Sequence, residues 1–219
     1  GVPVMRNWKR EVIDAGIRML SEGITIGTWG NVTVRDPETG YVYLSPSGMP
    51  YRSLTEDDIV VVRLDGSRVE GERKPTIETE MHLAIYRSRP ECNAVIHTHP
   101  VYSTAFSCMG EDIPLLLDEA AQVLGDVVRT TKYALPGSQE LAEECVKALG
   151  ERSMACLLKS HGAVCLGRDL EQAFGNSTVL EATAKVYSVI RAMGGQFDPI
   201  SPENIAFMQE FVRTKYGQR

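Results

Sequence analysis

This sequence has fewer basic than acidic residues. The 23 Lys and Arg residues are outnumbered by 29 Asp and Glu residues, which gives a net charge of −6 at pH 7. Binding to nucleic acid requires clustered Lys and Arg, and an anionic membrane surface attracts the same residues. The composition therefore argues against both kinds of partner. An anionic substrate would need local binding groups rather than the field of the whole protein.

Paired cysteines and long hydrophobic runs are also missing. The cysteines are an odd number at scattered spacings without a C-x-x-C pair, namely Cys92, Cys108, Cys145, Cys156 and Cys165. This usage favours a reducing compartment over a disulfide framework. No apolar stretch approaches the length that spans a bilayer, and no signal-peptide pattern opens the chain. We therefore expect a cytoplasmic protein.

The remaining composition is that of an ordinary globular protein, with 43% hydrophobic and 24% charged residues. Hydrophobic periodicity, turn residues and helix caps predict alternating helices and strands. No repeat or linker divides the chain, so we expect one domain of mixed α and β over residues 1–219. The predicted helices cover residues 7–21, 76–89, 101–109, 119–124, 139–149, 170–193 and 201–216, and the predicted strands cover 32–35, 41–44, 59–64, 94–99, 155–158 and 163–166.

One stretch carries most of the chemical information, the apolar run Ala94 to Pro100 with His97 and His99 near its end. The run reads as a buried strand, and side chains two residues apart on a strand point to the same face. His97 and His99 can therefore bind one ion together. His161, in a Ser-His-Gly turn between two predicted buried strands, offers a third ligand. Three histidines without cysteine suit a catalytic ion better than a structural one.

A carboxylate near the ion could act as a general base, and the sequence offers Glu78 or Glu80. Both follow Pro75 at the start of a predicted helix, and they cannot share a helical face. Glu78 and His82 are four residues apart and do share one. A first-turn glutamate can also serve only to compensate the helix dipole. The residues alone leave the choice between the glutamates open, and they favour His82 as an ordinary core or surface residue rather than a ligand.

Four motifs together resemble the class II aldolase/adducin family: Thr28–Arg35 (TWGNVTVR), Ser47–Tyr51 (SGMPY), His97-Thr98-His99 and His161-Gly162. The resemblance covers nearly the whole chain. It implies a three-layer α/β/α sandwich around a mostly antiparallel central sheet. It also implies that His97, His99 and His161 hold one Zn²⁺ per subunit, with Mn²⁺ or Co²⁺ as substitutes. Glu78, rather than Glu80, then matches the family's fourth ligand and acid/base.

The resemblance also assigns phosphate binding to loop residues, namely Gly30, Asn31, Ser47, Gly48 and Thr76. Backbone N–H groups, hydroxyls and a helix N-terminus can hold a dianion without any basic residue. Such a local site suits an acidic protein. Relatives form homotetramers with sites at subunit interfaces, so a homotetramer is the expected assembly.

The chain departs from the family's fuculose-phosphate enzymes at two positions. Ile77 stands where they have a second serine beside the catalytic glutamate, so one phosphate hydroxyl is missing. Asp118, followed by Glu119, stands where they have a tyrosine that donates a proton. Tyr216 resembles the C-terminal tyrosine that enters a neighbouring subunit's site. Asp118, Glu119 and Tyr216 are therefore the candidates for proton transfer on the aldehyde side of the substrate.

The resemblance favours a zinc-dependent aldolase that cleaves a phosphorylated ketose into dihydroxyacetone phosphate and an aldehyde. Ketose 1-phosphates of the fuculose, 5-deoxypentulose and methylthioribulose types all stay open as substrates. A 4-epimerase, decarboxylase or dehydratase of sugar phosphates is the alternative, although the epimerase branch has aspartate at the Glu78 position. A non-catalytic adducin-like domain is a weaker alternative, because all three histidines and the glutamate are present.

Overall fold

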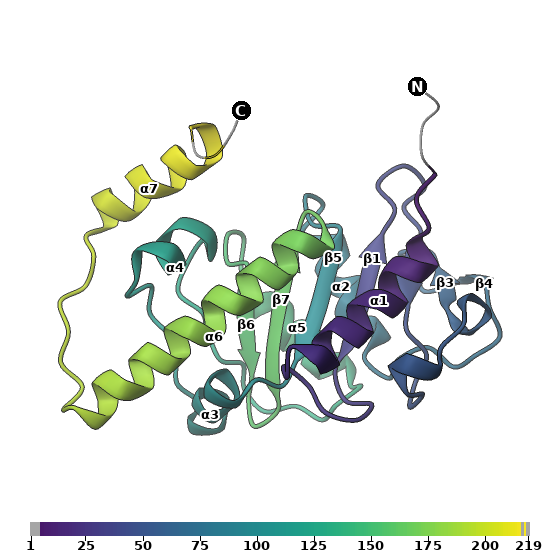
Figure 1. The fold of residues 1–219 in the computed structure, drawn as a ribbon, viewed down its shortest axis with the longest axis horizontal. Coiled ribbons are helices and arrows are strands. Elements are labelled where there is room, and N and C mark those ends of the chain that lie inside the picture. The colour runs from purple at the N-terminus through teal and green to yellow at the C-terminus, as the bar shows by residue number, and fades with distance from the viewer. Residues whose placement is uncertain (1–4, 216, 218–219) are drawn as a thin grey trace.

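The computed structural model describes residues 5–215 and 217, and within them a single sheet of seven strands forms the centre of the protein (Figure 1). The strand order is β4-β3-β2-β1-β5-β7-β6, and every neighbouring pair is antiparallel. The strands are β1 (Asn31–Arg35), β2 (Val42–Leu44), β3 (Val60–Val62), β4 (Arg68–Glu70), β5 (Ala94–Thr98), β6 (Ala155–Leu158) and β7 (Gly162–Gly167). The predicted antiparallel sheet is confirmed.

Helices cover both faces of this sheet, as predicted for a three-layer α/β/α sandwich. One face carries α1, α3 and α6, and the other carries α2 and α5 (Figure 1). A short α4 packs against α6 and α7 at one side. The helices are α1 (Trp8–Ser21), α2 (Thr79–Ser88), α3 (Val101–Met109), α4 (Asp118–Val123), α5 (Gln139–Leu149), α6 (Leu170–Ala192) and α7 (Pro202–Thr214).

Strand β5 shows how the two layers share the sheet. Ala94 and Ile96 belong to the hydrophobic cluster beneath α1 and α6, whereas Val95 belongs to the cluster beneath α2 and α5. Successive side chains on a strand alternate between faces. His97 therefore points to the same face as Val95, toward α2. The apolar residues of β5 are fully buried on both faces, which accounts for its continuous apolar sequence.

Helix α2 begins at Thr79, three residues later than predicted. The preceding segment pairs with another loop instead: Thr76 N donates to Ser45 O at 3.0 Å, and Ser47 N donates to Lys74 O at 2.8 Å. These bonds hold the segment before α2 in an extended pairing with residues 45–47. They also bring two loops distant in the sequence side by side next to Glu78.

Helix α7 lies apart from the main body in Figure 1, beyond an extended connection, and contacts α4. Its start is as predicted, with the Ser201 side chain accepting a hydrogen bond from Asn204 N and proline in the first turn. None of its described residues is buried. Across the described part of the chain, no helix has both the length and the apolar character needed to cross a membrane.

Candidate metal centre

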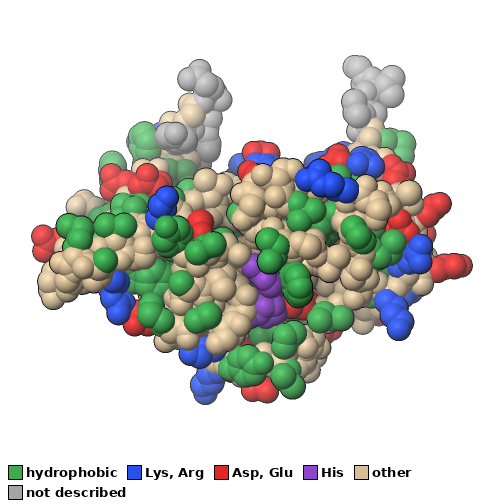
Figure 2. All heavy atoms as spheres, turned by 60° about the horizontal axis from the view of Figure 1, so that its bottom comes forward, with side chains coloured by type: hydrophobic (Ala, Val, Ile, Leu, Met, Phe, Trp, Pro, Cys, Tyr) green, Lys and Arg blue, Asp and Glu red, His purple; other side chains and the backbone are tan. Residues whose placement is uncertain are grey.

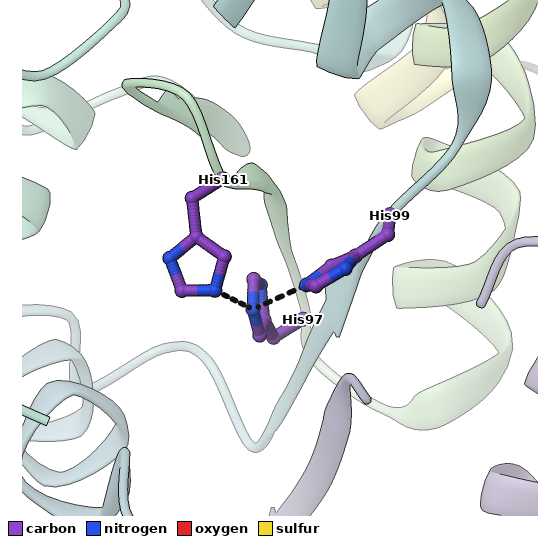
Figure 3. Close-up of side chains that lie close together, drawn as sticks. All are labelled: His97, His99 and His161. Carbon is purple, nitrogen blue, oxygen red and sulfur yellow. Dashed lines mark hydrogen bonds between the residues drawn. The ribbon is translucent and has the colours of Figure 1, made fainter. Parts of the chain in front are cut away.

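Three imidazoles converge at one end of the sheet (Figure 3). His97 is on β5, His99 directly follows this strand, and His161 lies in the turn between β6 and β7. The Nε2 atom of His97 is 3.1 Å from Nε2 of His161 and 3.1 Å from Nε2 of His99. Nitrogen ligands at 2.0–2.1 Å from a tetrahedral zinc ion stand about 3.3 Å apart. The spacing of these imidazoles therefore fits a shared divalent cation.

The tautomer of His97 is set by the sheet. Its Nδ1–H donates to the carbonyl oxygen of Ala163 on β7 at 2.9 Å, because the antiparallel register places His97 opposite Val164. The Nε2 atom is then left with its lone pair facing the other two rings. A backbone partner of this kind orients a histidine ligand and increases its basicity.

A tight turn brings His161 against β5. Ser160 adopts a left-handed backbone conformation, with φ of 57°, immediately before it. A Cβ atom on Gly162 would stand 2.4 Å from the carbonyl oxygen of Thr98 and 2.8 Å from Cδ2 of His99. Only glycine permits this approach of β7 to the end of β5. The glycine of the His-Gly pair is therefore needed for the geometry of the cluster.

Glu78 completes the cluster from the N-terminal end of α2. Its Oε2 is 3.3 Å from Nε2 of His97, and its Oε1 is 3.3 Å from Nε2 of His161. The side chain of Glu80 points elsewhere and accepts a hydrogen bond from Arg87 at 2.6 Å. Of the two glutamates that the residue pattern left open, the structure brings only Glu78 to the imidazoles.

Burial controls the charge of these groups. Glu78 is only 4% exposed, and desolvation raises the pKa of its carboxyl group, partly opposed by the nearby imidazoles and Asn31. Desolvation lowers the pKa of His97 to about 4 and, together with the neighbouring imidazoles, that of His99 to about 3. The pKa of His161 is lowered by the same causes. Neutral imidazole is the form that binds metal, so the site is electrostatically suited to a cation.

A cavity of about 200 Å³ opens onto these side chains, and Figure 2 shows the histidines in a hollow on this face of the molecule. The cavity is also lined by every residue predicted to bind phosphate, namely Gly30, Asn31, Ser47, Gly48 and Thr76. Ile77 and Trp29 lie at its edge, 63% and 62% exposed. The loops and the candidate metal ligands thus share one cavity.

The candidates for proton transfer on the aldehyde side are not brought into this cavity. Asp118 and Glu119 form the exposed first turn of α4 and do not line it. Tyr216 lies outside the described residues. The role predicted for these three residues stays a prediction.

The link from His82 to the cluster was not predicted from the sequence. His82 is fully buried, and its Nε2 contacts Oδ1 of Asn31, whose Nδ2 donates to Glu78 Oε2 at 3.2 Å. Of the core and surface positions left open for His82, the structure shows the core, and the ring reaches the cluster through Asn31. The four-residue spacing from Glu78 to His82 was the available signal.

The sequence profile described as the Class II Aldolase and Adducin N-terminal domain matches residues 10–188. The chain belongs to this family. Members of the class II aldolase family are metal-dependent lyases, and the prediction that this chain is such an enzyme is confirmed. Class II aldolases use a divalent metal, and the three-histidine cluster is where this chain could hold one.

Named proteins are similar over most of this chain. A 5-deoxy-D-ribulose 1-phosphate aldolase of Bacillus thuringiensis is 34% identical over 87% of this chain and 89% of its own. An L-ribulose-5-phosphate 4-epimerase of Salmonella paratyphi C is 32% identical over 98% of this chain and 100% of its own. The structure of an L-fuculose 1-phosphate aldolase superposes with a TM-score of 0.90 at 34% identity, covering 96% of this chain and 98% of that one.

Proposed function

We propose that this class II aldolase cleaves a ketose 1-phosphate to dihydroxyacetone phosphate and an aldehyde with the help of Zn²⁺. The observation that carries the proposal is the single cavity onto which three imidazoles, a buried carboxylate and two polar loops open. Two of the similar proteins are named as aldolases of sugar 1-phosphates, which supports the same substrate class here.

His97, His99 and His161 would hold the zinc ion, with Glu78 as a fourth ligand in the absence of substrate. The bound cation would act as a Lewis acid toward the substrate's carbonyl oxygen and so stabilise the negative charge that develops there. Mn²⁺ and Co²⁺ are the expected substitutes, because imidazole and carboxylate ligands accept them as well.

The loops would hold the phosphate. Gly30, Asn31, Ser47, Gly48 and Thr76 line the side of the cavity next to the metal ligands. Backbone N–H groups and hydroxyls at turns bind a dianion through directed dipoles, which the acidic protein needs in place of basic residues. An amide nitrogen carries two hydrogens, so Asn31 can donate to Glu78 and to the phosphate together.

Glu78 would move the proton at the reacting carbon. When the bond to the aldehyde carbon breaks, the electron pair stays with the dihydroxyacetone phosphate fragment, and Glu78 in its acid form then protonates that carbon. The raised pKa of this buried carboxyl group suits an acid that must hold and release a proton. The hydroxyl that becomes the aldehyde loses its proton to Asp118, Glu119 or Tyr216.

We also propose a homotetramer in which the tail of one copy reaches the site of its neighbour. Two of the side chains that line the cavity, Trp29 and Ile77, are large, apolar and exposed. Apolar side chains gathered around a site are typical of a surface that another chain covers.

The deciding experiment measures dihydroxyacetone phosphate release from fuculose, 5-deoxyribulose and methylthioribulose 1-phosphates. We expect release from at least one of them, its loss after complete chelation, and its recovery with Zn²⁺ and, to a lesser extent, Mn²⁺ or Co²⁺. Activity that survives complete metal removal would contradict the proposed mechanism.

The similarity to a 4-epimerase makes epimerisation the second candidate. It conserves the carbon chain, so NMR analysis of the products separates it from cleavage. Pentulose 5-phosphate converted to its epimer without release of a three-carbon product would replace the aldolase assignment.

A further inference from the structure

A polar ladder connects β1 to α2 behind the candidate metal centre. Two residues along a strand advance about 6.7 Å, and four residues along a helix advance about 6 Å. Asn31 and Thr33 on β1 therefore stay level with Glu78, which caps α2, and with His82 and Tyr86 on this helix. The contacts follow this match, from Asn31 to Glu78 and His82, and from Thr33 to His82 and Tyr86.

The Glu78 carboxylate, at the end of the ladder next to the candidate metal centre, determines which group donates in each hydrogen bond along it. A carboxylate accepts hydrogen bonds, so Asn31 must turn its Nδ2 toward Glu78, and its Oδ1 then faces His82 Nε2. His82 must therefore carry its proton on Nε2 and donate it to Asn31. Its Nδ1 is left as an acceptor, and the Thr33 hydroxyl donates to it at 2.8 Å.

Burial keeps this arrangement in place. The side chains of Thr33 and His82 are 0% exposed, and Tyr86 is 1% exposed. Desolvation lowers the pKa of His82 to about 3, so the ring is neutral and keeps a single N–H at neutral pH. The Thr33 hydroxyl, having donated to His82, is free to accept from the Tyr86 hydroxyl at 2.8 Å. Each step along the ladder then has a donor and an acceptor.

We propose that His82 is a positioning residue that acts on Glu78 through the side-chain amide of Asn31. Its Nε2–H holds the amide in the orientation that presents Nδ2 to the carboxylate. Without this donor the amide can rotate by half a turn, and Oδ1 then faces Glu78 Oε2, where two acceptors repel. The inference rests on the proposed role of Glu78 in proton transfer and adds the residues that aim it.

Two substitutions at His82 separate the donor from the bulk of the ring. The amide nitrogen of glutamine can take the place of His82 Nε2, whereas leucine has no donor. We expect H82L to lower kcat for exchange of the reacting-carbon proton of dihydroxyacetone phosphate with D₂O by about tenfold to a hundredfold, the range for partners behind a ligand. KM and zinc content should stay near those of the parent, and H82Q should recover most of the rate.

A second pair of variants covers the case in which H82L does not fold. Thr33→Val removes only the hydroxyl that fixes the tautomer of His82, and Thr33→Ser keeps it. We expect a several-fold lower exchange rate in T33V and a near-parental rate in T33S. Tyr86→Phe, at the far end of the ladder, should have the smallest effect.

A readout independent of catalysis is the tautomer itself. The chain has four histidines, so ¹⁵N-histidine spectra of the zinc-loaded protein are simple, and the signals lost in H82Q belong to His82. We expect a neutral ring protonated on Nε2. A ring protonated on Nδ1, an H82L exchange rate within twofold of the parent, or a rate loss that follows zinc loss would each overturn the proposal. A parent protein that exchanges no proton at all would instead refute the proposed function.

Discussion

At the scale of single residues, Glu78 and Glu80 form a natural pair for testing the acid/base assignment. Glu78→Gln keeps the shape of the side chain and removes its ability to carry a proton, so kcat for cleavage should fall by at least about 100-fold. Glu80→Gln breaks only an exposed ion pair with Arg87 and should leave kcat unchanged. Steady-state kinetics with zinc analysis checks both, and an active E78Q protein would remove Glu78 from the mechanism.

His82 should also make folding depend on pH. Its pKa is about 3 in the folded protein, because burial disfavours the charged ring, and about 6.5 in an unfolded chain. The unfolded state therefore binds more protons between these values, and the free energy of unfolding falls as the pH falls below 6.5. For this residue the loss between pH 6.5 and pH 5 is about 1.5 kcal/mol.

Urea unfolding of metal-free protein measures this contribution by comparison with H82Q. The parent should lose about 1.5 kcal/mol more than H82Q between the two pH values, while the other buried histidines contribute equally to both proteins. Equal losses would show that the buried ring at position 82 is not the neutral form described.

Residue patterns predicted the cluster of three imidazoles better than its surroundings. The spacing of His97 and His99 on a strand, and the His-Gly turn at His161, were sufficient to gather the three imidazoles. The choice of Glu78 over Glu80 came from family resemblance, because helix periodicity treats two first-turn glutamates alike. The contact from Asn31 to Glu78 could not be predicted, since it depends on the pairing of β1 with β5 and on where α2 starts.

At the scale of elements, the approach of β7 to β5 should be sensitive to a single methyl group. Gly162→Ala would place Cβ 2.4 Å from the carbonyl oxygen of Thr98, where backbone rather than a flexible side chain must move. We expect lower zinc affinity together with a loss of stability of about 1–3 kcal/mol, typical of overpacking.

Gly175→Ala is the matched control, because this glycine is on the exposed side of α6 with no atom within 4 Å of an added Cβ. It should raise stability by about 0.5–1 kcal/mol through helix propensity. Thermal unfolding and zinc titration of both variants check the pair. Unchanged zinc affinity in G162A would mean that the cluster tolerates a wider separation between β7 and the end of β5.

The elements themselves were largely readable from the sequence. Apolar periodicity, caps and terminators such as Pro90 placed the helices, whereas β4 was missed, because its short sequence is polar and largely exposed. The predicted start of α2 was wrong by three residues, because the segment before the helix pairs with residues 45–47 as extended backbone. Helix propensity depends on neighbouring residues only, so it cannot reveal a hydrogen-bonded partner about thirty residues away in the sequence.

At the scale of the whole molecule, α7 should be held by a neighbouring copy in the proposed tetramer. Phe207 and Phe211 are 71% and 42% exposed on a helix whose described residues include none that is buried. Burial of such rings stabilises association by about 1.5–3 kcal/mol each. Phe207→Ser should therefore shift the sedimentation profile toward smaller species and lower the activity with it. A parent protein that sediments as a monomer would contradict this expectation.

The overall architecture could be predicted only with the help of resemblance. Strand spacing alone does not reveal that β1 lies beside β5, a neighbour more than fifty residues further along the chain, or that β7 lies between β5 and β6. These long-range neighbours place Asn31 opposite His97 and His97 opposite Val164. The extent of a single domain over residues 1–219 stays a prediction.

The pairing of β5 with β7 would set the time at which the proposed metal centre is complete. During synthesis, the chain can offer only Glu78, His97 and His99 until residue 161 has emerged and the last two strands have closed. A divalent cation met earlier finds a weak chelate that competes poorly with the cell's other ligands. In the proposed metal centre, loading would therefore come late, and a fully loaded molecule would be one whose sheet has already been assembled.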